Sequence, residues 1–93
     1  MASSSEAFEK LSTWNQDKTW LNVTVIERGK QEDNLFVRIA ALDEESSLIG
    51  VAGKVMHSWA RFDVGEAEFS IESNRVVVSR EDVEWLIFEQ AES

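Results

Sequence analysis

The sequence has no cysteine and no proline, and it has a single histidine among its 93 residues. Without cysteine it can form no disulfide, no reactive thiolate and no cysteine-type zinc site. The acidic runs lack the spaced oxygen ligands and the central glycine of a calcium-binding loop. We therefore expect no metal and no cofactor.

Long apolar runs are also absent, because no segment approaches the ~20 apolar residues that a membrane-spanning helix needs. The first ten residues, MASSSEAFEK, lack the basic and apolar regions of a secretory signal. The lack of cysteine is typical of proteins in a reducing compartment. These features predict a cytoplasmic protein that does not enter a membrane.

Basic residues are scarce relative to acidic ones: 9 against 18, for a net charge of −9. Such a surface repels phosphate backbones and anionic lipid headgroups. We therefore expect no direct binding to nucleic acid or membranes. On electrostatic grounds, a basic protein partner is favoured.

The chain is long enough for one small domain, which we expect to span residues 1–93 with residues 1–4 as a flexible tail. Apolar residues make up 43% of it, including four tryptophans and five phenylalanines, which is sufficient for a core. Ser5 is expected to cap a short N-terminal helix that carries Phe8 and Leu11 on one face. Residues 12–20 are predicted to be a polar connector with Trp14 and Trp20 near its ends.

Most of the remaining chain alternates between apolar and polar residues, which is typical of strands with one buried face. Loops are expected at 28–34 and 43–47, a bulge or bend at Gly50 or Gly53, and a hairpin turn at Ser73 and Asn74. The pattern predicts a mainly β protein: a small antiparallel barrel or sandwich of 5–6 strands with an SH3-like cadence and a short N-terminal helix.

Residues 80–91 fit two structures. Val83, Trp85 and Ile87 alternate with polar Glu84, as in a strand, and the segment is rich in β-branched and aromatic residues. Ser79 and Asp82, however, resemble a helix capping box. We favour the strand; the alternative is an α+β fold with a C-terminal helix at 80–91.

The segment VMHSWARFDVGE, residues 55–66, contains the histidine together with a serine and an aspartate. On a strand Ser58 would point away from His57, because side chains alternate between faces. Asp63 lies six residues along, too far to orient the imidazole of His57. The segment is therefore predicted to be an amphipathic strand without catalytic function, and we expect no enzyme activity.

The outer face of this strand is the predicted partner-binding surface. It carries Trp59 between His57 and Arg61, and an acidic stripe follows at Glu66, Glu68 and Glu72. An aromatic anchor beside negative charge suits a basic partner, because complementary charge speeds encounter and a buried aromatic slows release.

The sequence thus predicts a non-enzymatic acidic module that binds a basic protein surface, as an adaptor, an immunity-type inhibitor or a nucleic-acid mimic would. The alternative is a small-molecule-binding barrel with Trp14 and Trp20 at its mouth. Edge strands without proline can pair with each other, so an edge-to-edge homodimer also stays open.

Overall fold

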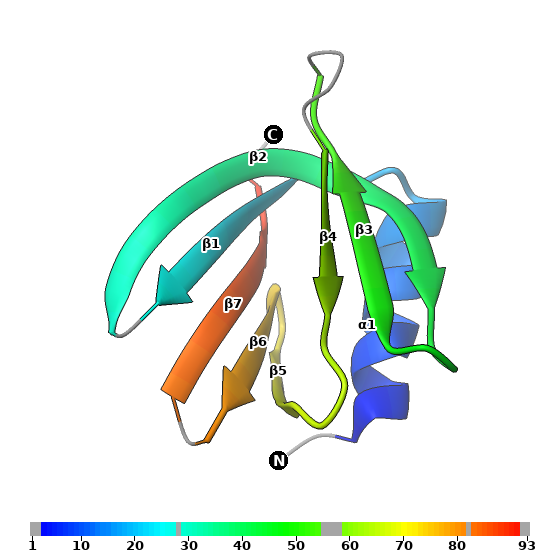
Figure 1. Cartoon of the computed structure of the whole chain (residues 1–93). Coiled ribbons are helices and arrows are strands. Elements are labelled where there is room, and N and C mark those ends of the chain that lie inside the picture. The colour runs from blue at the N-terminus through cyan, green and yellow to red at the C-terminus, as the bar shows by residue number, and fades with distance from the viewer. Residues whose placement is uncertain (1–2, 28, 55–58, 82, 92–93) are drawn as a thin grey trace.

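The computed structural model describes residues 3–27, 29–54, 59–81 and 83–91. Within these ranges, one helix is followed by seven antiparallel strands (Figure 1). The elements are α1 (Ser4–Gln16), β1 (Leu21–Glu27), β2 (Lys30–Asp43), β3 (Leu48–Ala52), β4 (Trp59–Asp63), β5 (Glu68–Glu72), β6 (Arg75–Arg80) and β7 (Val83–Gln90). The mainly β composition and the N-terminal helix are as the sequence predicts.

The strands form one open sheet in the order β4-β3-β2-β1-β7-β6-β5. The predicted closed barrel or sandwich of 5–6 strands is not what the structure shows. The long strand β2 curves over the molecule (Figure 1) and pairs first with β1 and then with β3. The β2–β3 register shifts between Ile39 and Ala41, opposite Gly50. A Cβ atom added to Gly50 would lie 3.4 Å from the Cβ atom of Ala41. The bulge expected at Gly50 therefore lies opposite it, with Ala40 of β2 as the extra residue.

Helix α1 begins earlier and ends later than the sequence predicts. Its N-cap is Ser3 rather than Ser5, because Ser3 and Glu6 form a reciprocal capping box. It continues to Gln16, so residues 12–16 are helical and not part of a connector. The physical reason is its apolar face: Leu11 and Trp14 follow Ala7 at helical spacing, and all three are buried.

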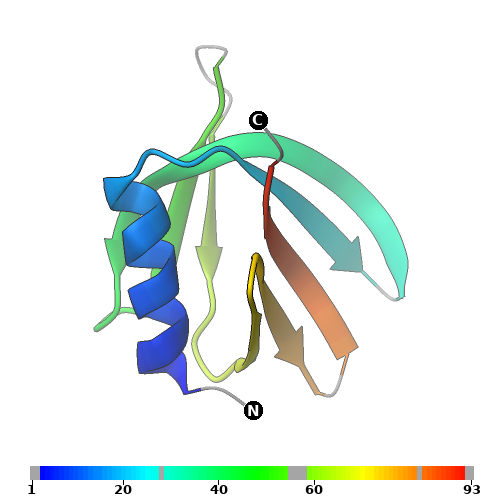
Figure 2. The same cartoon turned by 180° about the vertical axis from the view of Figure 1, so that it is seen from behind.

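The core lies between α1 and the inner face of the sheet (Figure 2). Phe8 of α1 meets Phe69 of β5 edge to face at 6.4 Å. From the middle strands, Leu21, Val23, Leu86 and Phe88 are all fully buried. The helix contacts β2 and β5, which lie in different parts of the strand order, and so it fastens the curved sheet across its inner side.

Two further predictions about local structure have clear outcomes. Residues 30–34, expected in a loop, belong to β2, and only a tight turn at Gly29 separates β1 from β2. Lys30 and Gln31 pair with β1 beyond the last β1–β7 pair, whereas Asp33 and Asn34 lie opposite Val25 and Thr24 and are exposed. Residues 83–90 form β7, so the helical alternative for 80–91 is wrong.

Candidate functional site

Strands β1 and β7 are paired along most of their length but separate at one end. The last paired residues are Val25 and Leu86. Beyond them β1 continues beside β2 to Glu27, and β7 begins beside β6 at Val83. Figure 1 shows these two ends diverging at the lower left. A register shift lies beside the separation in each hairpin, between Val25 and Ile26 and opposite Trp85.

The divergence leaves a hollow of about 340 Å³, which we call the β1–β7 cleft. Seven residues line it: Val25, Ile26, Glu27, Arg80, Val83, Glu84 and Trp85. The side chain of Val83 is apolar and 50% exposed. The volume is at the lower end of the range of ligand sites and suits one or two amino-acid side chains.

Trp85 forms the apolar wall of the cleft. The β6–β7 pairing passes from Val78–Leu86 to Ser79–Glu84, so Trp85 is the extra residue of a β-bulge. A bulge re-aims the side chain of the extra residue. The Trp85 ring consequently packs against the core and meets Phe62 edge to face at 6.3 Å.

Arg80 covers part of the Trp85 ring. Its guanidinium carbon lies 3.7 Å from the ring centroid, in a cation–π contact. Arg80 Nη2 also donates a hydrogen bond of 2.7 Å to the backbone oxygen of Asp63. A guanidinium is therefore already bound to this indole within the chain, which shows that the site accommodates such a group.

Acidic side chains surround Arg80 on two sides. Glu27 and Glu84 line the β1–β7 cleft, and Glu66 and Glu81 line a second hollow that also contains Arg80. The described lining of these two hollows thus contains four carboxylates and one guanidinium, so its net charge is negative. Among the residues that the structure describes, the only ion pairs within 4 Å are those of Arg75 with Glu72 and Glu89. None of the four carboxylates lies within 4 Å of a basic nitrogen of another described residue.

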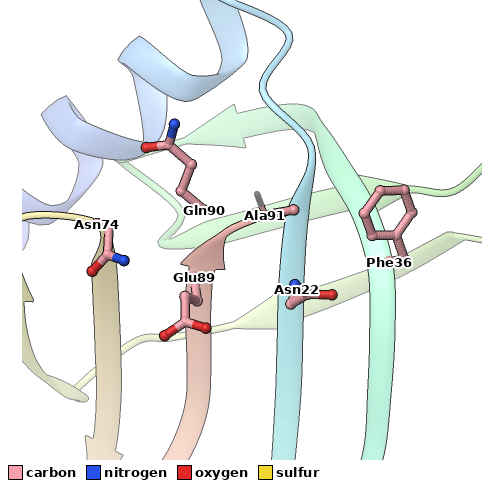
Figure 3. A pocket seen from close by; sticks show the side chains of 6 residues that line it. All are labelled: Asn22, Phe36, Asn74, Glu89, Gln90 and Ala91. Carbon is pink, nitrogen blue, oxygen red and sulfur yellow. The ribbon is translucent and has the colours of Figure 1, made fainter. Parts of the chain in front are cut away.

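A third hollow, which we call the outer hollow, lies on the outer face of the sheet and has a volume of about 540 Å³. Residues of β1, β2, β7, the β5–β6 turn and the residue that follows β7 line it: Asn22, Phe36, Asn74, Glu89, Gln90 and Ala91 (Figure 3). Phe36 is 47% exposed and stacks on Trp20 at a centroid distance of 5.1 Å. Lys54 lies 5.1 Å from the Trp20 ring and 5.5 Å from the Phe36 ring.

The predicted partner-binding residues of β4 lie on its exposed face. Trp59, Arg61 and Asp63 are exposed and alternate with half-buried Ala60 and Phe62, as the sequence predicts. Trp59 is 69% exposed. His57 lies outside the described residues.

The predicted acidic stripe does not lie on the strand that carries Trp59; two of its three residues are on β5, the other edge strand of the sheet. Glu68 and Glu72 are exposed on β5, whereas Trp59 is on β4, at the other end of the strand order. Glu66 lies in the connection between β4 and β5 with a φ of 63°. Of these three residues, Glu66 is the one that the structure brings to the acidic hollow beside Arg80.

The two tryptophans predicted to line a barrel mouth lie in different environments. Trp14 lies on the buried face of α1, and Lys10 Nζ is 5.1 Å from the centroid of its ring. Its burial leaves no ring face for a ligand. Trp20 is half-buried beside the outer hollow, where it supports Phe36 from one side.

The sequence reasoning missed five site residues: Glu27, Arg80, Val83, Glu84 and Trp85. One signal was present: in SREDVEWLIF, acidic residues stand among apolar ones at the start of a strand. The position at which β1 and β7 separate depends on two bulges, and local sequence does not specify where pairing ends.

Among the described residues, no three side chains of histidine, aspartate or glutamate are grouped as a metal site would require. None of the helical segments described is both long and apolar enough to cross a membrane. Comparison with protein-family models, with curated proteins and with solved structures gives no match. Arguments about function therefore rest on the geometry above.

Proposed function

We propose that the chain is a non-enzymatic acidic interaction module, and that it binds a basic protein partner at the β1–β7 cleft. The observation that carries the proposal is a hollow lined by apolar Trp85 and Val83, whose charged lining is acidic apart from Arg80. Apolar contact surrounded by complementary charge is typical of protein interfaces.

The net charge of −9 supports the same partner chemistry. A negative field raises the rate of encounter with a cationic surface and disfavours other acidic proteins. Net charge alone does not define where a partner binds. The cleft provides a defined place in which an apolar side chain of the partner is removed from water. A lysine- or arginine-rich surface that presents an apolar residue fits both features.

The charge of the cleft can be tested by neutralising Glu27 and Glu84 together as Glu27→Gln and Glu84→Gln. The probe is a blocked peptide of alternating lysine and valine, titrated by calorimetry at low and moderate salt. Each exposed ion pair contributes about 0.2–1 kcal/mol, so the double variant should bind about fivefold more weakly and with less dependence on salt.

The matched control is Glu9→Gln with Glu45→Gln, which removes the same charge from two exposed positions that do not line the cleft. We expect this control to bind nearly as well as the unmodified chain. Equal losses in the two double variants would show that net charge, and not the cleft, governs binding. Salt-independent binding, or no binding of the cationic peptide at all, would contradict the proposal.

The outer hollow supports a second candidate function, the binding of a small planar molecule. Phe36 offers an exposed ring backed by Trp20, and Asn22 and Asn74 offer amide groups that line the same hollow. Stacking on aromatic rings and hydrogen bonding to amides is a common way to hold a planar ligand.

A change in tryptophan fluorescence on addition of planar metabolites, such as nucleosides, would test this second function. Because Trp20 stacks on Phe36, a ligand on Phe36 should alter the Trp20 emission, and Phe36→Ala should weaken the response at least tenfold. The control is Trp59→Phe, which removes an exposed tryptophan from another strand. An unchanged spectrum across the panel would reject small-molecule binding.

A further inference from the structure

The β1–β7 cleft offers exposed backbone as well as side chains. Among the described residues, Val83 and Glu84 of β7 pair only with β6, and Trp85 at the bulge has no strand partner, because the pairing of β7 with β1 begins at Leu86. A strand segment paired on one side presents free N–H and C=O groups to an incoming chain. Here these groups line a hollow, so an incoming segment would also contact side chains.

We infer that a short extended segment of the basic partner adds to the free edge of β7 at Val83–Trp85, antiparallel to it. This inference rests on the proposed function and specifies how the partner binds. Backbone hydrogen bonds supply affinity in such strand addition, and the side-chain pockets supply specificity. The available edge is three residues long, so the segment is correspondingly short.

The side chains around this edge define the sequence that would fit. Val83 and Trp85 both line the cleft and accept apolar neighbours, while Glu84 between them and Glu27 across from them accept a cation. Cross-strand neighbours contribute through apolar contact or opposite charge. The partner segment is therefore one in which apolar residues alternate with lysine or arginine.

Charge complementarity is what selects this occupant over a second copy of the same chain. Nine net negative charges on each copy would oppose self-association at a surface that is already acidic. A strand from a second copy stays an outcome of the test. It would appear as a concentration-dependent dimer in the absence of any added peptide.

Backbone methylation of the lysine–valine peptide tests strand addition directly. N-methylation of alternate residues on the edge that faces β7 removes the donated hydrogen bonds and adds steric bulk, whereas N-methylation on the opposite edge leaves them intact. Because the register is unknown, two peptides are made, one methylated on each set of alternate residues. We expect one of them to bind at least tenfold more weakly, and the other to bind like the unmodified peptide.

Hydrogen exchange at the amides of Val83–Trp85 gives an independent readout, which should slow when the unmodified peptide binds. If both methylated peptides bind as well as the parent and exchange is unchanged, strand addition is wrong while the proposed function stands. If both bind poorly because the peptide enters between two edges, the single-edge geometry is wrong. If neither the parent peptide nor polylysine binds, both the inference and the proposed function fail.

Discussion

Replacing Phe88 by alanine is expected to lower the free energy of unfolding by about 3–5 kcal/mol. Phe88 is fully buried on β7, and its ring meets Phe62 edge to face at 6.2 Å. The alanine variant loses the burial of a whole aromatic ring and leaves a cavity in a close-packed core. No other phenylalanine of β1–β7 that the structure describes is fully buried.

The size of this effect matters because small domains have little stability in reserve. At about 0.05–0.15 kcal/mol per residue, a 93-residue chain is stable by roughly 5–14 kcal/mol. A loss of 3 kcal/mol or more should lower the melting temperature by at least ~12 °C. Thermal and urea unfolding followed by circular dichroism would measure it.

Phe36→Ala is the matched control, since it makes the same substitution on a strand of the same sheet. Phe36 is 47% exposed and stacks on Trp20, so its removal creates no enclosed cavity. We expect the destabilisation to be well below that of Phe88→Ala. Similar losses for the two variants would mean that the core does not lie on the side of the sheet described above.

For β1, β3 and β5 the sequence was sufficient to predict the buried face, because alternation is a local property. On β7 the alternation of Val83 and Ile87 selects the wrong face, since Leu86 and Phe88 are the fully buried residues. The sequence predicted that β4 exposes Trp59 and Arg61, and that the last element is a strand rather than a helix. It also located the hairpin turn at Ser73 and Asn74. All of these follow from residue types within a few positions of one another.

Strand number and closure could not be predicted in the same way. Whether β4 pairs with β5 to close a barrel depends on the curvature of β2 and on the position of α1 in space. The extent of β2 was underestimated because residues 30–34 are polar, although they pair with β1 through the backbone. Hydrophobic pattern is a weak guide where a hairpin extends beyond the covered part of a sheet.

The candidate site shows the same distinction. An exposed tryptophan at position 59 can be recognised from alternation, and the sequence analysis selected it as the anchor. Trp85 looks like a core residue by the same criterion, because it lies in an apolar run. Only the bulge opposite Ser79 and the end of the β1–β7 pairing reveal that Trp85 also forms the wall of an open hollow.

Replacing Trp85 by alanine is therefore expected to have the largest effect on binding. Loss of an interface tryptophan from a central position commonly costs 2 kcal/mol or more, which is about a 30-fold loss of affinity. Calorimetric titration with the lysine–valine peptide would measure the loss. The same change removes the cation–π partner of Arg80, so some loss of stability is expected as well.

Two further variants separate binding from folding. Trp85→Phe retains an aromatic ring against Phe62 and Arg80, and it should recover much of the affinity together with the stability. Trp59→Ala makes the same substitution at the anchor chosen from the sequence, and it should leave affinity unchanged because Trp59 does not line the β1–β7 cleft. If Trp59→Ala abolishes binding and a folded Trp85→Ala does not, the partner docks on β4 and the sequence-based site is the correct one. The Trp59 and Trp85 variants thus distinguish binding on the exposed face of β4, which the sequence predicts, from binding in the β1–β7 cleft.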